Sequence, residues 1–199
     1  MPEPDSPRVV LASGSPRRRE LLASLGIEPI IRVPDVDETL RDGETPRGYV
    51  VRLACEKAAV VAAHADVTAG DLVFGADTTV VLDGAIIGKP TNRADAAAIL
   101  RRLSGRTHQV HTGVAARLGG RVESTVVDTD VTFVSLSDDD IAWYVATGEP
   151  DDKAGAYGMQ GTGTVIVASI DGSPSNVIGL PLPAVVELAA RLGVRLLAL

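Results

Sequence analysis

DLVFGADTTVVL, residues 71–82, carries the strongest strand signal in the chain. Apolar and β-branched side chains fill the stretch, and this composition predicts a buried strand. The Asp83-Gly84 pair that follows predicts a hairpin turn, and Gly88-Lys89-Pro90 ends the returning strand. We therefore expect a sheet at the centre of the protein.

Strands and helices are expected on both sides of this hairpin. The further strands are expected at residues 8–13, 27–33, 106–118, 121–134 and 164–170. The helices are expected at residues 16–25, 46–65, 92–103, 137–148 and from 181 onward. This order predicts an α/β fold with a mixed sheet in one domain that spans residues 1–199.

Composition bounds the function classes. The 199 residues are 45% hydrophobic and 23% charged, which is typical of a globular protein and excludes a disordered chain. Cys55 is the one cysteine, so a disulfide framework and a four-cysteine zinc site are excluded. The formal net charge of −7 argues against non-specific nucleic-acid binding.

No targeting or membrane segment is expected. Met1 to Pro7 is short and acidic, without the basic and apolar regions of a signal peptide. No stretch of 18 apolar residues without a charge occurs, so we expect no membrane span and a cytoplasmic protein.

Asp77 is the first candidate for chemistry. It closes the apolar run from Leu72 to Ala76, near the carboxyl end of the expected strand, where α/β sheets bind ligands. A carboxylate in a sheet core costs several kcal/mol unless it is paired or bound to a metal. The position therefore favours a functional role over a structural one.

The segment from Ser13 to Arg18 (SGSPRR) lies at a strand-to-helix junction. Unpaired N–H groups of the first helical turn, with Arg17 and Arg18, form a phosphate site in this interpretation. The alternative is an ordinary helix cap, with Ser15 as the N-cap residue and two solvated arginines.

Two further groups complete the set. The loop after the second strand carries Asp35, Asp37 and Glu38, which are either a second source of metal ligands or plain loop residues. The three lysines, Lys57, Lys89 and Lys153, stand in a chain whose other 16 basic residues are arginines. Carboxylates, lysines and arginines together are what phosphate-anhydride chemistry with a divalent cation requires.

Other motifs fail. Gly161-Thr162-Gly163 lacks the third glycine of a dinucleotide fingerprint, and no G-x-S-x-G motif occurs. His108 and His111 lie three residues apart on an expected strand, so they point to opposite faces and do not share a metal.

Eight ordered segments carry a family resemblance. They are LASGSPRRRELL (11–22), VDET (36–39), YVVRLACEKA (49–58), GADTTVV (75–81), GKP (88–90), LSGRTHQVHTGVA (103–115), GEPDDKAGAYGMQG (148–161) and NVIGLPL (176–182). With these segments the chain resembles, from end to end, the Maf family of nucleotide pyrophosphatases. The fold that this implies has an elongated mixed sheet and two lobes with a cleft, similar to inosine triphosphate pyrophosphatases.

The resemblance also implies an activity. It is hydrolysis of a nucleoside triphosphate to the monophosphate and pyrophosphate, with a divalent cation such as Mg²⁺, Mn²⁺ or Co²⁺. Asp77 is then the general base or a metal ligand, and Glu38 helps to hold the metal. The other residues implied to line the site are Ser15, Arg17, Arg18, Lys57, Lys89 and Gln160.

Three positions indicate a branch of the family. Arg17, Thr78 and Gln160 match the branch that prefers dTTP and UTP, whereas the 7-methyl-GTP branch typically has Trp, Gln and Glu there. The pairing edge of thymine or uracil presents acceptor, donor and acceptor, which an amide such as Gln160 can match.

Alternatives remain open at this point. One is a pyrophosphatase with a broader range of modified or purine nucleotides, and another is a regulatory role in septum formation through nucleotide binding. Lys153 either serves the phosphates, which we favour, or holds its own loop. The resemblance allows a homodimer.

Overall fold

The computed structural model describes residues 7–197. The segment from Met1 to Pro7, in which we expect no targeting signal, lies outside this range except for Pro7. Among the described residues, no helix combines the length and the apolar character that a membrane crossing requires.

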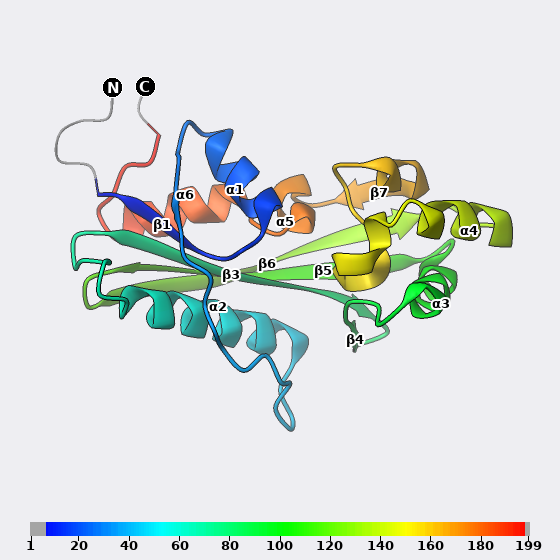
Figure 1. Cartoon of the computed structure of the whole chain (residues 1–199), viewed down its shortest axis with the longest axis horizontal. Coiled ribbons are helices and arrows are strands. Elements are labelled where there is room, and N and C mark those ends of the chain that lie inside the picture. The colour runs from blue at the N-terminus through cyan, green and yellow to red at the C-terminus, as the bar shows by residue number, and fades with distance from the viewer. Residues whose placement is uncertain (1–6, 198–199) are drawn as a thin grey trace. The chain divides into compact units, whose positions relative to one another are not determined.

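The strands form a mixed sheet, as expected (Figure 1). Its order is β2-β1-β3-β5-β6-β7, with β4 paired to β3. β1 runs parallel to β2 and β3, whereas β4 and β7 run antiparallel to β3 and β6. The strands are β1 (Val9–Ala12), β2 (Ile30–Ile31), β3 (Leu72–Leu82), β4 (Ala85–Ile87), β5 (Thr107–Leu118), β6 (Arg121–Phe133) and β7 (Val167–Asp171).

Helix boundaries follow the capping residues. The side chains of Thr45, Asn92 and Ser137 each accept a backbone N–H at a helix N-terminus, which is the usual role of these residue types. The α-helices are α1 (Pro16–Ala23), α2 (Pro46–Ala62), α3 (Arg93–Leu103), α4 (Asp138–Ala146), α5 (Pro174–Ile178) and α6 (Leu182–Arg191). Three short 3₁₀ helices are η1 (Glu149–Asp152), η2 (Ala154–Ala156) and η3 (Thr162–Ile166).

Two expected strands differ from the structure, and one helix was not expected. The second strand is only Ile30–Ile31, which pair with Val10 and Leu11 of β1, and the next contact to β1 is the Arg32 N–H bond to the Leu11 carbonyl oxygen. The strand expected at 164–170 starts later, at Val167, after the 3₁₀ helix η3. Helix α5 was not expected from the sequence, since five residues carry too little periodicity.

The chain divides into two compact units. Within the described residues, unit 1 comprises 7–77, 112–127 and 179–197, and unit 2 comprises 78–111 and 128–178. Three of the four boundaries fall inside β3, β5 and β6, so each unit contains part of these three strands. Each unit also has its own hydrophobic core.

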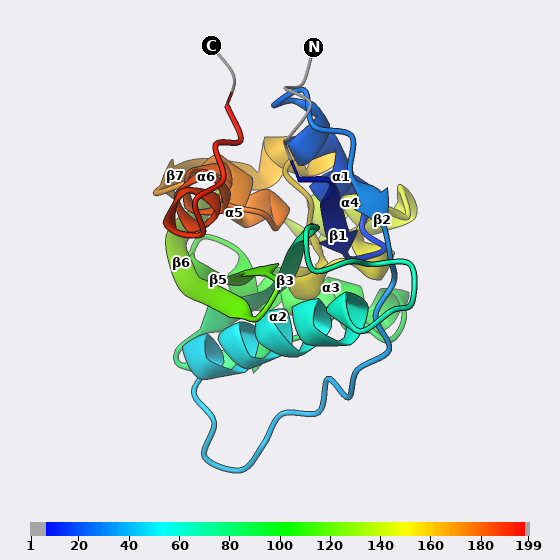
Figure 2. The same ribbon diagram turned by 90° about the vertical axis from the view of Figure 1, so that its left-hand side faces the viewer.

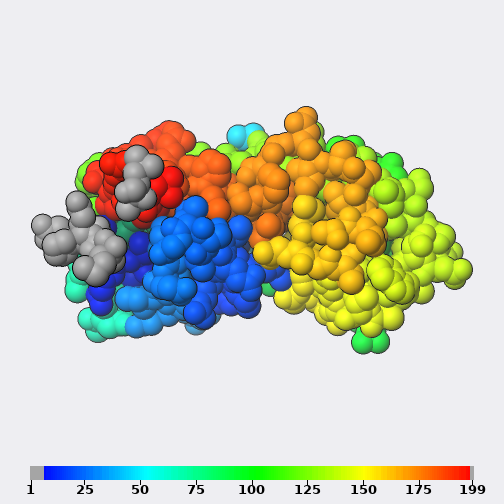
Figure 3. All heavy atoms as spheres, turned by 90° about the horizontal axis from the view of Figure 1, so that it is seen from above, coloured from blue at the N-terminus to red at the C-terminus, as the bar shows by residue number. Residues whose placement is uncertain are grey.

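In unit 1, helices cover both faces of the sheet (Figure 2). On one face, α2 packs Ala54, Ala58 and Val61 against Val10 and Val73 of the strands. On the other face, α1 and α6 pack against the opposite side chains of β1 and β3. Figure 3 shows α1, in blue, beside α6, in orange-red, over this second face.

Two glycines let α2 approach the sheet closely. A Cβ at Gly75 would meet the carbonyl oxygen of Ala54 and lie 2.8 Å from the amide nitrogen of Ala58. A Cβ at Gly113 would meet the carbonyl group of Val50 in the same way. Helix backbone and strand backbone are thus in direct contact, which brings the α2 side chains close to β3.

Candidate active site

The alternation of β3 directs Asp77 toward α2. Val73, Gly75 and Asp77 share one face of the strand, because side chains two apart point the same way. Gly75 contacts α2, so Asp77, one step further along, lies on the helix side of the sheet. Its exposed fraction is 8%.

Lys57 is the charged member of the buried face of α2. The buried residues of the helix are Val50, Leu53, Ala54, Lys57, Ala58 and Val61. The 3.6-residue period of the helix places all six on one side, so a lysine within this apolar stripe needs a partner in the sheet. It finds one in Asp77.

Two carboxylates converge on the Lys57 ammonium. Its Nζ lies 2.7 Å from Asp77 Oδ1 and 2.6 Å from Glu38 Oε1. The other oxygen of Asp77, Oδ2, accepts no hydrogen bond from residues 7–197 in the recorded contacts. The structure thus brings Asp77, Lys57 and Glu38 together and leaves one carboxylate oxygen available.

Burial sets the proton affinity of Asp77. Desolvation raises the pKa of this carboxyl above its ordinary value, and the positive charges of Lys57 and Arg18 oppose the rise. A carboxylate with a raised pKa is a stronger base than one in water. The arrangement therefore suits a group that accepts a proton.

The acidic loop contributes one residue to this cluster. Of the three acidic candidates in the loop, Glu38 is the one that pairs with Lys57. Asp37 is exposed, and hydrogen bonds from the side chain and from the backbone N–H of Thr39, the latter at 2.9 Å, lower its pKa. Asp35 is exposed and has no recorded contact to the Lys57 cluster.

Tyr49 and Arg52 hold the Glu38 loop on α2, a role that the sequence analysis missed. The Tyr49 hydroxyl donates to the Glu38 carbonyl oxygen at 2.9 Å. Burial, with the charges of Asp77 and Glu38, raises the pKa of Tyr49 to about 12, so the phenol stays a donor. The sequence does not show which group the Tyr49 hydroxyl binds, because its partner lies eleven residues away on a loop.

Arg52 fastens the same loop at a second point. Its guanidinium binds both Glu44 oxygens, at 2.7 and 2.8 Å, and the Thr39 carbonyl oxygen at 3.1 Å. It also reaches Glu56 on the next helical turn at 3.1 Å. A bidentate pair of this kind has a fixed geometry, so the segment from Thr39 to Glu44, directly after Glu38, is held on α2.

The strand-to-helix junction is built around Arg18. Its Nη1 donates to Ser13 Oγ at 3.0 Å and its Nε to the Gly179 carbonyl oxygen at 2.8 Å. Burial lowers the pKa of Arg18, and the nearby Asp77 charge counteracts this. Ser15 is the N-cap residue of α1, but its side chain makes no capping bond, and Arg17 is half-buried beside it.

The remaining predicted residues belong to unit 2. Lys89 is exposed and has no recorded partner among residues 7–197. Lys153 instead donates to the Glu149 carbonyl oxygen and pairs with Asp152, both at 2.7 Å, which is the loop-holding arrangement. Thr78 is half-buried on β3, and Gln160 is exposed.

The two histidines have separate partners, as their spacing predicts. His108 Nε2 lies 2.9 Å from the Tyr157 hydroxyl, and His111 Nδ1 lies 2.6 Å from Asp128 Oδ1. Burial lowers the pKa of His108 to about 4, so this ring is neutral.

The donor set fits a divalent cation. Among residues 7–197, no group of three or more His, Cys, Asp or Glu side chains could hold a metal. Mg²⁺ takes one or two protein carboxylates and completes its shell with water and substrate phosphates. The converging oxygens of Asp77 and Glu38 match that need, and a cation there depends on the substrate for further ligands.

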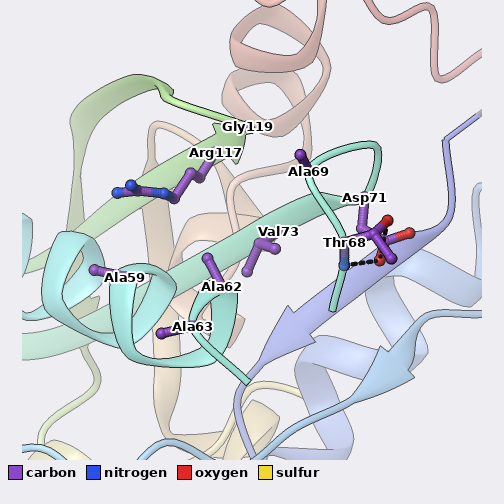
Figure 4. Close-up of a pocket in the computed structure, with 9 residues that line it drawn as sticks. All are labelled: Ala59, Ala62, Ala63, Thr68, Ala69, Asp71, Val73, Arg117 and Gly119. Carbon is purple, nitrogen blue, oxygen red and sulfur yellow. Dashed lines mark hydrogen bonds between the residues drawn. The ribbon is translucent and has the colours of Figure 1, made fainter. Parts of the chain in front are cut away.

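A pocket at the other end of α2 has different chemistry (Figure 4). Its volume is about 230 Å³, and alanines of α2, Thr68, Asp71 and Arg117 line it. Figure 4 shows the Asp71 carboxylate bonded to the Thr68 backbone, and Arg8 also binds it at 2.6 and 2.7 Å. None of the predicted site residues lines this pocket.

Comparison with known proteins identifies the family. Residues 8–192 match the sequence profile described as "Maf-like protein". The chain is 53% identical over 193 residues to a protein of Myxococcus xanthus (strain DK1622) named "dTTP/UTP pyrophosphatase", with 96% of each chain covered. It is 52% identical over 179 residues to a protein of that name from Shigella dysenteriae serotype 1, with 89% of each covered.

Among solved structures, the Staphylococcus aureus Ham1 protein is similar at 16% identity and a TM-score of 0.42. The alignment covers 87% of this chain and 85% of that one. The profile match includes every predicted site residue and nearly the whole described chain. The chain belongs to the Maf family.

Proposed function

We propose that the chain is a nucleoside triphosphate pyrophosphatase that hydrolyses dTTP and UTP to the monophosphate and pyrophosphate. The observation that carries the proposal is the buried Asp77 carboxylate, held at 2.7 Å by Lys57 with one oxygen left over. The names of the relatives at about half identity support the choice of nucleotide.

Asp77 acts as the general base. Its carboxylate accepts a proton from the water whose oxygen attacks the α-phosphorus, and the bond from that phosphorus to the bridging oxygen breaks. Pyrophosphate leaves with the electron pair of that bond. The raised pKa of Asp77 favours the proton transfer, and Lys57 fixes the carboxylate in one orientation.

Glu38 and Asp77 would hold a divalent cation, Mg²⁺, Mn²⁺ or Co²⁺. When bound, the cation would neutralise phosphate charge and make water more acidic. The Tyr49 and Arg52 contacts keep Glu38 within reach of this position.

Basic groups bind the phosphates. Arg17 and Arg18 are placed at the N-terminus of α1, where the helix dipole and the Ser15 hydroxyl also attract anions. Lys89 is assigned the same role because its ammonium is exposed and has no recorded partner in residues 7–197. For Lys153, phosphate binding stays a prediction beside its observed contacts within the loop.

Thr78 and Gln160 are assigned to base recognition. Gln160 has no recorded side-chain hydrogen bond among the described residues, so its amide is available to a pyrimidine edge. A single domain with two lobes and a cleft, a cytoplasmic location and a homodimer all stay predictions.

The test is a panel of nucleoside triphosphates. The purified protein is incubated with Mg²⁺ or Mn²⁺ and dTTP, UTP, 7-methyl-GTP or ITP, and pyrophosphate release is measured. We expect the fastest release from dTTP and UTP. A purine preference would keep the reaction and overturn the assignment of Arg17, Thr78 and Gln160. No release from any nucleotide would favour the regulatory binding role.

A further inference from the structure

The carboxylate of Glu149 organises the loop that carries Gln160. Oε2 accepts the backbone N–H of Thr162 at 2.7 Å and the Thr162 hydroxyl at 2.5 Å. Oε1 accepts the N–H of Gly163 at 3.2 Å and the hydroxyl of Tyr144 at 3.0 Å. One side chain thus satisfies four donors, and three of them belong to the segment that follows Gln160.

Three glycines let the loop close around this carboxylate. A Cβ at Gly158 would lie 2.9 Å from Glu149 Oε1, and a Cβ at Gly161 would meet Oε2. A Cβ at Gly163 would lie 2.5 Å from the Tyr144 hydroxyl. The glycine pattern that fails as a dinucleotide fingerprint therefore has another physical reason, which is direct backbone contact with an internal anion.

Two phenols hold the start of the same loop. The Tyr144 hydroxyl accepts the N–H of Gly158 at 3.1 Å, and the Tyr157 hydroxyl lies 2.9 Å from His108 Nε2. The loop is fixed at residues 157–158 and again at 162–163, so only Met159, Gln160 and Gly161 span the gap. Figure 3 shows this part of the chain, in yellow and orange, at the surface of unit 2.

The Glu149 carboxylate is itself held in its charged form. Burial alone would raise the pKa of Glu149, but the bonds from Thr162, Gly163 and Tyr144 outweigh it and the pKa falls below its ordinary value. The Glu149 backbone is fixed too, since its carbonyl oxygen accepts from Lys153 at 2.7 Å. The anchor is therefore rigid on both sides.

We propose that Glu149 is a positioning residue for base selection, which acts by holding the 158–163 loop so that the Gln160 amide is presented in one orientation. The inference rests on the proposed function. When a side-chain amide rotates by 180°, its oxygen and its NH₂ group exchange places, so it can pair with acceptor and donor groups in either order. Its selectivity for one base therefore depends on a fixed backbone. Loss of the anchor should relax the choice of base more than it slows the chemical step.

The experiment compares Glu149→Gln with the wild type. A glutamine turns an NH₂ group toward donors that need an acceptor, so the loop loosens. We expect the ratio of kcat/KM for dTTP to that for ITP to fall at least about tenfold, mainly through KM for dTTP, with kcat within about threefold. Amide hydrogen exchange of residues 158–163 should become about tenfold faster.

Asp151→Asn is the matched control. Asp151 lies on the same short helix, is exposed, and its side chain makes no recorded contact among residues 7–197. This variant should keep the wild-type nucleotide ratio and exchange rates. If Glu149→Gln does not fold, Tyr144→Phe removes one hydroxyl from the same network and is expected to lower the ratio about threefold.

The outcomes separate the two proposals. A wild type that releases no pyrophosphate from any nucleotide contradicts the proposed function, and exchange then still reports whether Glu149 holds the loop. An active wild type whose folded Glu149→Gln variant keeps the nucleotide ratio overturns the positioning role alone. An unchanged ratio in Tyr144→Phe, where only that variant folds, overturns it as well.

Discussion

Asp71 and Asp77 stand at opposite ends of one buried segment, yet their environments differ completely. The side chain of Asp71 binds Arg8 through both oxygens and also accepts the N–H and hydroxyl of Thr68. These hydrogen bonds, led by that of Arg8, lower the pKa of Asp71 to about 2. Asp77 has Lys57 as its recorded hydrogen-bond donor, and burial raises its pKa.

The difference separates a structural carboxylate from a chemical one. Asp71 accepts one hydrogen bond through Oδ1 and three through Oδ2, so its protonation would cost stability. Asp77 is buried and has Lys57 as its hydrogen-bond donor, so its carboxylate has a raised affinity for a proton. The contacts of Lys57 with Asp77 and Glu38 fix the position of this carboxylate. Four substitutions in unit 1 test this comparison.

Asp77→Asn should have the largest effect. The amide keeps the shape of the side chain but accepts no proton, so kcat/KM for dTTP is expected to fall about 10³-fold. The measurement is pyrophosphate release, with circular dichroism to verify folding. Near-normal turnover in a folded variant would remove Asp77 from the mechanism.

Lys57→Met should reduce activity about 100-fold and shift its pH dependence. The Lys57 charge lowers the pKa of Asp77, so its removal raises that pKa further. A base works above its pKa, and the acid limb of kcat/KM should therefore move up by about one pH unit.

Lys57→Arg is the control for charge, and it should leave the acid limb near its wild-type position. The full pH profile of kcat/KM distinguishes the two variants. An acid limb that stays in place in Lys57→Met would show that Asp77 does not titrate in the reaction.

Gly75→Ala tests the close approach of α2 midway between the two carboxylates. The new methyl group would meet the Ala54 carbonyl and force the helix away, at a cost of about 1–3 kcal/mol in the free energy of unfolding. Urea denaturation measures it. At Gly120 a Cβ meets no atom within 4 Å, so Gly120→Ala should be nearly neutral. Equal stability of the two variants would contradict the direct contact.

Asp71→Asn should have the smallest effect, on stability and not on activity. Because the folded pKa is lowered, the carboxylate stabilises the fold above about pH 4, and this is lost as pH falls toward 2. The half-exposed Arg8 limits the loss at pH 7 to about 1 kcal/mol.

The check on Asp71 is urea denaturation at pH 7 and at pH 2, with exposed Asp42→Asn as control. The variant and the wild type should differ at pH 7 and converge at pH 2. A stability difference that is the same at both pH values would mean that the Asp71 charge is not responsible. A large loss of activity in Asp71→Asn would contradict the conclusion that Asp71 is structural whereas Asp77 takes part in the reaction.

Local patterns in the sequence predicted much of this protein. Residues 71–82 give β3, and Asp83-Gly84 turns with both φ angles positive, as the hairpin signal requires. Thr45, Asn92 and Ser137 cap the helices expected after them. Asp77, Glu38 and Lys57 were named because a charge in an apolar stretch, or within a matching motif, is visible without a structure.

Only the tertiary structure decided how these groups are used. The Asp77–Lys57–Glu38 cluster joins a strand, a helix and a loop, and Tyr49, Arg52 and Glu149 act through backbone groups distant in sequence. Residue type and spacing reveal which groups are costly to bury, because that cost is local. The partner that offsets the cost of burying such a group depends on which segment of the chain packs beside the group. Tertiary packing alone determines which segment that is.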